Sequence, residues 1–209
     1  MIVTGIEEFT KSRSRVFLDG EFAFVLYKGE LRHYHLKVGE AVSEADYGQI
    51  MGELLPKRAK LRAMNLLLKK DYTTAQLREK LQKGEYPADI VQQALDYVEA
   101  FHYTDDLRYA TDYITYHQDS KTKLRLEQDL RARGIPKDVL EEAWKSWEQA
   151  GGCQHEEEMI GELLRKRGYD PENATPTQQK KEYGFLMRKG FSAEKVRRAI
   201  WGRSEMWGE

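Results

Sequence analysis

Short apolar runs characterise the first forty or so residues of the chain. Residues 16–18 and 22–27 are rich in β-prone side chains, and Asp19-Gly20 separates them. Asp-Gly between two such runs favours a two-residue type I′ hairpin, because both turn residues need a positive φ. A second turn is expected at 28–30, followed at 31–36 by the alternation of an exposed strand. Since two or three strands rarely fold alone, we expect this small sheet to pack on the first helix that follows.

From Ser43 onward, apolar residues recur three and four positions apart, which is typical of amphipathic helices. Ser43, followed by Asp46, predicts the start of the first helix. Three short segments in this part share one pattern: a Leu, a basic helix end, a Gly, a bulky apolar residue, and then Pro or Ser. The segments span residues 81–87, 130–136 and 186–192. The first copy departs at one position, because Glu85 stands where the others have Gly134 and Gly190.

Each copy of this pattern predicts a helix end and the start of the next helix. Gly after a basic turn is typical of a helix C-terminus, because Gly enters the left-handed region cheaply and the cations complement the helix dipole. The Pro then takes the first position of the following helix, or the Ser caps it. The positions five, eight and nine residues past the bulky apolar residue also coincide: Val91, Leu140 and Val196; Ala94, Ala143 and Ala199; and Leu95, Trp144 and Ile200.

A further helix precedes each copy, near residues 61–70, 107–116 and 159–167, and Thr73-x-x-Gln76 and Thr175-x-x-Gln178 resemble capping boxes. Each unit therefore has three helices in roughly 45–55 residues, the size of a helical repeat. The predicted fold is mainly α: tandem three-helix repeats in an elongated, curved solenoid, preceded by a small N-terminal β-hairpin or sheet region. The expected division is a β-rich extension at 1–42, a first helical repeat at 43–104, a second three-helix repeat at 105–152 and a third at 153–209.

The composition is that of a helical cytoplasmic protein. Charged residues make up 33% and hydrophobic residues 40% of the 209 positions. The single cysteine, Cys153, forms no intramolecular disulfide, which favours a reducing compartment. The N-terminus lacks a signal-peptide pattern, and no apolar run approaches the ~20 residues that cross a bilayer. We therefore expect a cytoplasmic protein without membrane association.

The net charge is only −1, but basic residues cluster along the chain. One cluster covers residues 57–70, and others lie in the second and third repeats. A single basic residue more often belongs to a solvated helix face, but clusters suit phosphates or an acidic protein surface. Any DNA contact is expected to be independent of sequence. The candidate partner- and DNA-binding residues are Lys121, Lys123, Arg125, Arg131, Arg133, Arg165, Arg167, Arg188, Lys189, Arg197 and Arg198.

Two other features have structural explanations that we favour over functional ones. The acidic stretch 103–106 could form a site, but Thr104 or Asp105 at a helix start is expected to act as a cap. Four tryptophans could stack on nucleic-acid bases. Their helical spacing, with Trp144 matched to Leu95 and Ile200, favours the core instead. These tryptophans are Trp144, Trp147, Trp201 and Trp207.

No motif names a catalytic residue, a cofactor site or a metal site. His33 and His35 share one face of the expected strand but lack a third ligand nearby. His155-Glu156 lacks the second His of a zinc-protease motif. There is no phosphate-binding Gly-rich loop and no nucleophile elbow. We therefore predict a protein without enzymatic activity or cofactor.

Several stretches resemble the RecX family of recombinase regulators, and the likeness covers nearly the whole chain. Residues 62–69 and 73–81 are similar to the family's first repeat. Residues 103–110, an aromatic and two Asp before an aromatic-Ala pair, look like its most recognisable stretch. Residues 126–136 match the signature of the second repeat. One departure is that Ser-Lys-Thr-Lys at 120–123 stands where relatives usually carry Gly.

The resemblance implies a modulator of the recombinase RecA. It implies binding in the groove of the RecA–DNA filament, inhibition of ATP turnover, strand exchange or filament growth in DNA repair, and a weak affinity for single- and double-stranded DNA. We expect a monomer that acts by shape and charge. The alternative is a stand-alone DNA- or RNA-binding repeat protein that needs no filament.

Overall fold

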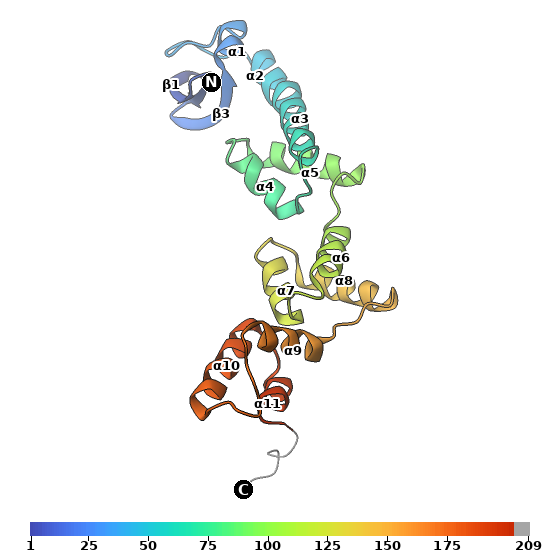
Figure 1. The fold of residues 1–209 in the computed structure, drawn as a ribbon. Coiled ribbons are helices and arrows are strands. Elements are labelled where there is room, and N and C mark those ends of the chain that lie inside the picture. Colours follow the sequence, from blue (N-terminus) through green and yellow to red (C-terminus); the bar gives the residue numbers. More distant parts are fainter. Residues whose placement is uncertain (203–209) are drawn as a thin grey trace. The chain divides into compact units, whose positions relative to one another are not determined.

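The computed structural model describes residues 1–202. The chain folds as two compact units, residues 1–105 and residues 106–209, and each is described by itself. Unit 1 holds the N-terminal sheet and its helices, and unit 2 is helical in the part that is described (Figure 1). The fold is thus mainly helical, with three-helix repeats and a small N-terminal antiparallel sheet, as the sequence predicts.

Three antiparallel strands form the N-terminal sheet in the order β1-β2-β3: β1 (Val3–Thr10), β2 (Arg13–Leu18) and β3 (Glu21–Tyr27). Asp19 and Gly20 have φ values of 50° and 91° between β2 and β3. The positive φ at both residues confirms the predicted hairpin turn.

The segment after the sheet is a helix, so the turn expected at 28–30 and the strand expected at 31–36 are wrong. Helix α1 spans Lys28–His33, and the Glu30 carboxylate accepts a hydrogen bond of 2.7 Å from the Tyr27 backbone N–H at its start. Leu31 and Tyr34 pack against the core at helical spacing. A few alternating residues fit this period as well as a period of two, so the pattern could not choose between them. His33 and His35 therefore do not share a strand face.

The helices of unit 1 continue one core that begins in the sheet. Ser43 caps α2 by accepting a hydrogen bond from the Asp46 backbone N–H, which confirms the predicted helix start. Buried side chains of β3, such as Phe24, share a core with Leu55 and Leu95, as expected for a sheet that packs on helices. The helical elements are α2 (Glu44–Gln49), a π-helical turn η1 (Ile50–Leu54), α3 (Leu55–Leu67), α4 (Thr74–Gln82) and α5 (Ala88–Ala100).

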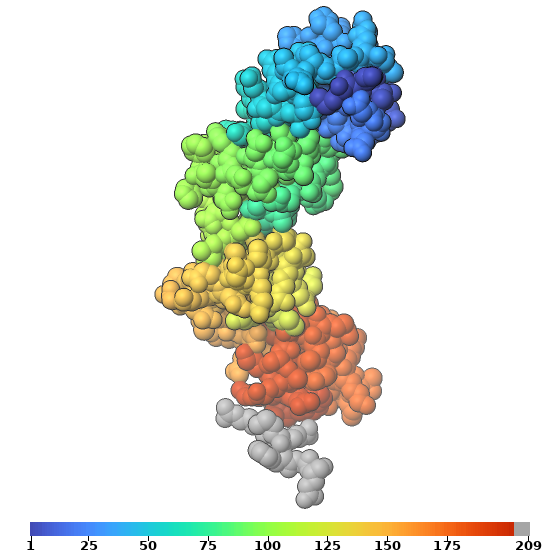
Figure 2. Space-filling model, turned by 180° about the vertical axis from the view of Figure 1, so that it is seen from behind, coloured from blue at the N-terminus to red at the C-terminus, as the bar shows by residue number. Residues whose placement is uncertain are grey.

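Unit 2 contains two further groups of three helices, each with its own core. The first core includes Ile114, Leu130 and Trp144, and the second includes Ile160 and Leu186. The two groups, yellow and orange to red in Figure 2, contact each other within the unit. The helices are α6 (Asp106–His117), α7 (Lys123–Arg131), α8 (Lys137–Gln149), α9 (Glu156–Lys166), α10 (Pro176–Lys189) and α11 (Ala193–Trp201).

The predicted repeat positions lie in the cores. All nine coincident apolar residues are buried except Ala199, which is half-buried against the third core. Trp144 and Trp147 are each only 6% exposed, which confirms the core interpretation. Trp201 also packs against the third core, and Trp207 lies outside the described residues.

The three turns between the middle and last helices share one backbone conformation. Gly134 and Gly190 have φ values of 81° and 89°, and Glu85 has 56° at the equivalent place. Pro87 and Pro136 are the N-cap residues of α5 and α8 and not their first helical residues, so each helix begins one residue later than expected. The reason is that each Pro has an extended ψ and its carbonyl accepts the first helical hydrogen bond.

The ends of the other helices follow the predicted signals closely. Both capping boxes, at Thr73 and Thr175, are formed. Ser192 caps α11, as expected. Helix α3 begins earlier than the predicted 61–70 and ends at Leu67, before the highly exposed Leu68.

The four-part division at residues 42, 104 and 152 stays a prediction. Within residues 1–202, no helix has the length and apolar character needed to cross a membrane.

Candidate nucleic-acid interface

Some of the predicted basic residues hold the second repeat together. The Lys121 ammonium lies 2.7 Å from the Asp129 carboxylate and 2.6 Å from the Tyr113 hydroxyl oxygen. Arg133 donates a hydrogen bond of 2.7 Å to the Asp129 carbonyl and stacks 4.4 Å from the centre of the Tyr113 ring. Burial raises the pKa of Asp129, but hydrogen bonds from Lys121 and Tyr113 lower it more, so its pKa falls below the ordinary value. Lys121 and Arg133 therefore have structural partners.

Arg167 has a similar role in the third repeat. Its guanidinium makes two hydrogen bonds to the carboxylate of Glu182, which is only 7% exposed. These hydrogen bonds lower the pKa of Glu182 against the opposing effect of burial. Arg167 also lies 4.2 Å from the centre of the Phe185 ring. A paired, stacked guanidinium of this kind is primarily a packing element.

Three other candidates have carboxylate neighbours but stay partly exposed. Arg131 pairs with a Glu one turn earlier on its helix, at 3.2 Å. Arg198 contacts one carboxylate on its own helix and one on α9, each at 2.9 Å. Lys123 lies 4.0 Å from the nearest carboxylate and 4.6 Å from the centre of the Trp144 ring. Such surface pairs contribute little to stability, so these cations remain available to a partner.

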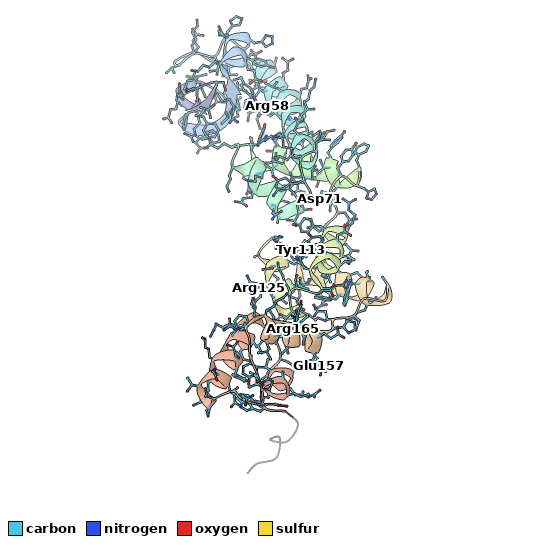
Figure 3. The ribbon with its side chains drawn as sticks, viewed as in Figure 1. Arg58, Asp71, Tyr113, Arg125, Glu157 and Arg165 are labelled. Carbon is cyan, nitrogen blue, oxygen red and sulfur yellow. The ribbon has the colours of Figure 1, made fainter. Side chains whose placement is uncertain are left out.

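The remaining candidates are exposed, and fewer carboxylates neutralise their charge. Arg165, Arg188 and Arg197 have no carboxylate partner within residues 1–202. Arg125, labelled in Figure 3, is 58% exposed. It lies only 3.3 Å from the Asp129 carboxylate, which it shares with Lys121.

Four of the predicted residues surround one hollow in unit 2, which we call the α7–α10 hollow. Lys121 and Arg125 come from the second repeat, and Arg188 and Lys189 from the end of α10. The hollow has a volume of about 610 Å³. The other residues that line it are Ser120, Thr122, Leu163, Phe185 and Phe191.

The start of α7 and the end of α10 position this hollow. The Thr122 hydroxyl donates a hydrogen bond of 3.0 Å to the Lys189 carbonyl and accepts one of 3.3 Å from the Arg125 backbone N–H. Gly190 ends α10 in the left-handed region, and a Cβ there would lie 2.8 Å from the Thr122 hydroxyl oxygen. Gly190 is therefore required both by its backbone and by the close approach of the two repeats.

The basic cluster at 57–70 in unit 1 is divided by the fold. Arg58 lies on α3 and points toward the sheet, where it donates to Glu30 at 2.7 Å and to the Val25 carbonyl at 2.6 Å (Figure 3). Its side chain is only 17% exposed, so Arg58 joins the sheet to the helices. Lys60 and Lys70 lie over the rings of Tyr97 and Tyr72.

A second basic hollow lies in unit 1, and sequence reasoning missed it. We call it the sheet–repeat hollow, because Arg13 of β2 lines it together with Arg62 of α3 and Lys80 and Lys83 near the end of α4. Its volume is about 520 Å³. The four residues are separated by up to seventy positions and belong to three elements, so no local pattern in the sequence links them.

Metal and acidic sites receive no support from the described residues. Within residues 1–202, no group of three or more His, Cys, Asp or Glu side chains could hold a metal ion. Thr104 is buried, and its hydroxyl donates to the Tyr72 carbonyl at 3.0 Å. Capping of α6 by Thr104 or Asp105 stays a prediction.

Family models match the chain in three successive places. The first three-helix domain of RecX matches residues 59–97, the second matches 105–143 and the third matches 155–200. The chain belongs to the RecX family. Its repeats are those of RecX, and each matched range covers most or all of the first helix of a repeat and more than half of its last helix. RecX proteins are regulatory proteins, so the role of this chain is regulatory.

Individual RecX proteins support this assignment. Regulatory protein RecX of Trichlorobacter lovleyi is 33% identical over 150 residues, covering 70% of this chain and 96% of that protein. That of Caldanaerobacter subterraneus is 26% identical over 202 residues, covering 96% and 98%. A crystal structure of regulatory protein RecX has a TM-score of 0.62 at 24% identity and covers 95% of this chain and 98% of its own. RecX from Lactobacillus salivarius has a TM-score of 0.57 at 18% identity and covers 70% and 94%. These two structures share the fold.

Proposed function

We propose that this chain modulates RecA by binding along the groove of the RecA–DNA filament. It lowers recombinase activity by limiting ATP turnover, strand exchange or filament growth during DNA repair. The chain acts in the cytoplasm as a monomer, by shape and charge, without catalytic chemistry or a cofactor. It has a weak affinity of its own for single- and double-stranded DNA, independent of sequence.

The α7–α10 hollow is the observation that carries this proposal. Two successive repeats contribute four cations to one hollow on a chain whose net charge is only −1. Leu163, Phe185 and Phe191 add apolar surface beside these cations. Mixed basic and apolar surface suits a partner that presents both phosphates and protein, as a DNA-bound filament does.

Side-chain pairing narrows the set of residues that we propose for this contact. Arg125, Arg188 and Lys189 face the hollow with exposed side chains, whereas Arg133 and Arg167 are held by neighbours in the fold. Arg165 and Arg197 are exposed and extend the candidate surface over the third repeat. We therefore place the main contact at the first three residues.

A titration of the DNA-dependent ATPase of the cognate RecA on single-stranded DNA tests the proposal. Wild type should inhibit well below the concentration that coats the DNA. Arg125→Glu combined with Arg188→Glu should need about tenfold more protein for half-inhibition, a loss of about 1.4 kcal/mol of binding. The matched control is Lys137→Glu with Lys145→Glu, which makes the same charge change on exposed positions of α8. Inhibition only at DNA saturation, or equal loss in both variants, would contradict the proposal.

The second candidate function is stand-alone nucleic-acid binding. The cations of both hollows favour it, because cations suit the phosphates of a bare nucleic acid as well as those of a filament. Pure phosphate binding falls steeply between low and moderate salt, because it depends on counterion release. A filament complex that also buries protein surface should persist better at the same salt.

A further inference from the structure

The N-terminal sheet has no role in the function proposed above, yet it is docked firmly on the first repeat. The Arg15 guanidinium of β2 makes two hydrogen bonds of 2.6 Å to the Glu85 carboxylate, in the turn after α4. Glu85 takes a φ of 56°, a conformation that the other two repeats assign to Gly. A non-Gly residue in this region is strained, so the carboxylate rather than the backbone explains its presence here.

This ion pair brings the walls of the sheet–repeat hollow together. Arg13 precedes Arg15 by two positions on β2 and so lies on the same face of the strand. Both guanidinium groups also lie near the Phe9 ring, at 5.0 Å and 4.7 Å. Lys83 precedes Glu85 by two positions in the turn. The pairing of Arg15 with Glu85 therefore places Arg13 and Lys83 around one hollow.

Few carboxylates neutralise the cations of this hollow. Arg13, Arg62 and Lys80 have no carboxylate partner within residues 1–202, and Lys83 pairs with an exposed Glu79 one turn away on its own helix. No acidic residue is among those that line the hollow in the described part of the chain. Four cations in a hollow of about 520 Å³ therefore create a strongly positive site.

The other lining residues indicate which anion fits. Apart from Gly84, they are hydroxyl-bearing or aromatic: Thr10, Ser12, Tyr27 and Tyr86. The Thr10 hydroxyl oxygen is buried without a hydrogen-bond partner among the described residues. Tyr27 is 42% exposed, and the Arg58 guanidinium lies 5.1 Å from the centre of its ring, so the exposed part of the ring can contact a base. No aliphatic side chain is among the described lining residues, so the hollow offers apolar contact only through its two Tyr rings.

We propose that the sheet–repeat hollow is a binding site for the phosphodiester backbone of a single nucleic-acid strand. Guanidinium groups and ammonium groups bind the phosphates, hydroxyls donate to their oxygens, and Tyr27 offers a stacking surface. The site is built jointly by the N-terminal sheet and the first repeat, which gives the sheet a function. It deepens the proposed function, because it rests on the chain's own proposed affinity for DNA, and it does not require RecA.

Binding of a fluorescein-labelled oligothymidylate to the full chain, followed by anisotropy without RecA, tests this site. Arg62→Glu with Lys80→Glu changes two exposed residues of the hollow on different helices. The variant should bind at least tenfold more weakly. The slope of log affinity against log salt should become less negative by about 1.4, since each single-strand phosphate contact contributes about 0.7. Lys137→Glu with Lys145→Glu is the charge-matched control and should change neither quantity substantially.

Two competitors identify the ligand. An unlabelled single strand should displace the probe, whereas inorganic phosphate at equal ionic strength and polyglutamate of equal charge should displace little of it. Displacement by polyglutamate as strong as by the oligonucleotide would indicate an acidic protein partner and overturn the assignment to nucleic acid. Strong displacement by inorganic phosphate would reduce the site to a small-anion pocket and also overturn it.

Unchanged affinity and salt slope in the Arg62→Glu, Lys80→Glu variant would contradict the site directly. A thermal melt of the variant checks that it is folded. Loss of DNA binding with full RecA inhibition would support this site and leave the proposed function intact. A failure of RecA inhibition in wild type would contradict the proposed function and leave the DNA result standing.

Discussion

The two basic hollows carry similar charge but are built in different ways. In unit 2, two repeats meet through Thr122 and Gly190, and the cations stand beside Leu163, Phe185 and Phe191. In unit 1, a strand meets a repeat through a salt bridge, and the described lining contains no aliphatic side chain. The apolar part of the α7–α10 hollow suits a protein surface with DNA, and the sheet–repeat hollow suits a bare strand. The difference teaches that the residues beside the cations, more than the charge itself, distinguish the two kinds of contact.

The same difference is visible in the turns that support each hollow. Gly190 and Glu85 occupy equivalent repeat positions, and both have positive φ values, of 89° and 56°. At Gly190 the absent side chain permits close packing against the Thr122 hydroxyl. At Glu85 the side chain itself makes the contact, through Arg15. Substitutions at these turns should therefore have opposite effects.

Gly190→Val should have the largest effect, because it breaks the junction between the second and third repeats. A β-branched residue is strained at this φ, and its Cβ would lie 2.8 Å from the Thr122 hydroxyl oxygen. We expect a loss of about 3 kcal/mol in the free energy of unfolding, measured with urea. Gly161→Ala is the control: Gly161 lies within α9 with open space around it, so Ala should stabilise by up to about 1 kcal/mol. A neutral Gly190→Val would mean that the repeats do not meet as described.

Arg167→Ala should have the next largest effect, because it leaves the buried Glu182 carboxylate without its partner. At pH 7 the Tm should fall on the order of 5 °C. Arg167 lowers the pKa of Glu182 below 4.5 in the folded protein. The pair therefore stabilises the fold above that pH, and its contribution is lost as the pH falls through the lowered pKa.

The difference in Tm between wild type and Arg167→Ala should accordingly shrink in acid, which thermal melts between pH 7 and pH 3 can measure. Arg165→Ala, at an exposed residue without a carboxylate partner within residues 1–202, should show little change at any pH. A Tm difference that stays constant with pH would argue against the ion pair as its cause.

Glu85→Gly should have the smallest effect on stability, and it sharpens the comparison most. Gly relieves about 1 kcal/mol of backbone strain, and the lost contact with Arg15 offsets part of this gain. Gly134→Ala, at the equivalent turn of the second repeat, should instead cost about 1–2 kcal/mol, because its φ is 81° and no side-chain contact compensates. Urea unfolding of both variants measures the contrast. Equal destabilisation would show that the turns are not equivalent.

Local signals explain why much of the fold could be predicted. The hairpin at Asp19-Gly20 and the capping boxes at Thr73 and Thr175 depend on residues a few positions apart. Helix α1 could not be predicted in this way, because its N-cap is Tyr27, which is not a typical capping residue, although Glu30 accepts a hydrogen bond from its backbone N–H. Its short apolar pattern fits a strand equally well.

The candidate site was less predictable, because charge alone does not reveal pairing. Lys121 and Arg167 belonged to the expected basic surface, but Asp129 and Glu182 engage them in the fold. The repeat pattern marked Glu85 as a departure, and only the structure shows its partner on β2. A tertiary contact of this kind leaves no periodic trace in the sequence.

The most direct test of a filament-binding regulator compares two affinities of the chain. One is its affinity for a RecA filament on single-stranded DNA, and the other is its affinity for the same DNA without RecA. The labelled chain would be titrated onto both at about 200 mM salt, where binding to phosphates alone is weakened. The account predicts binding to the filament at least tenfold tighter than to the bare strand, with the advantage reduced by Arg125→Glu and Arg188→Glu. Equal affinity for the filament and the bare strand would contradict it and leave a plain nucleic-acid-binding protein.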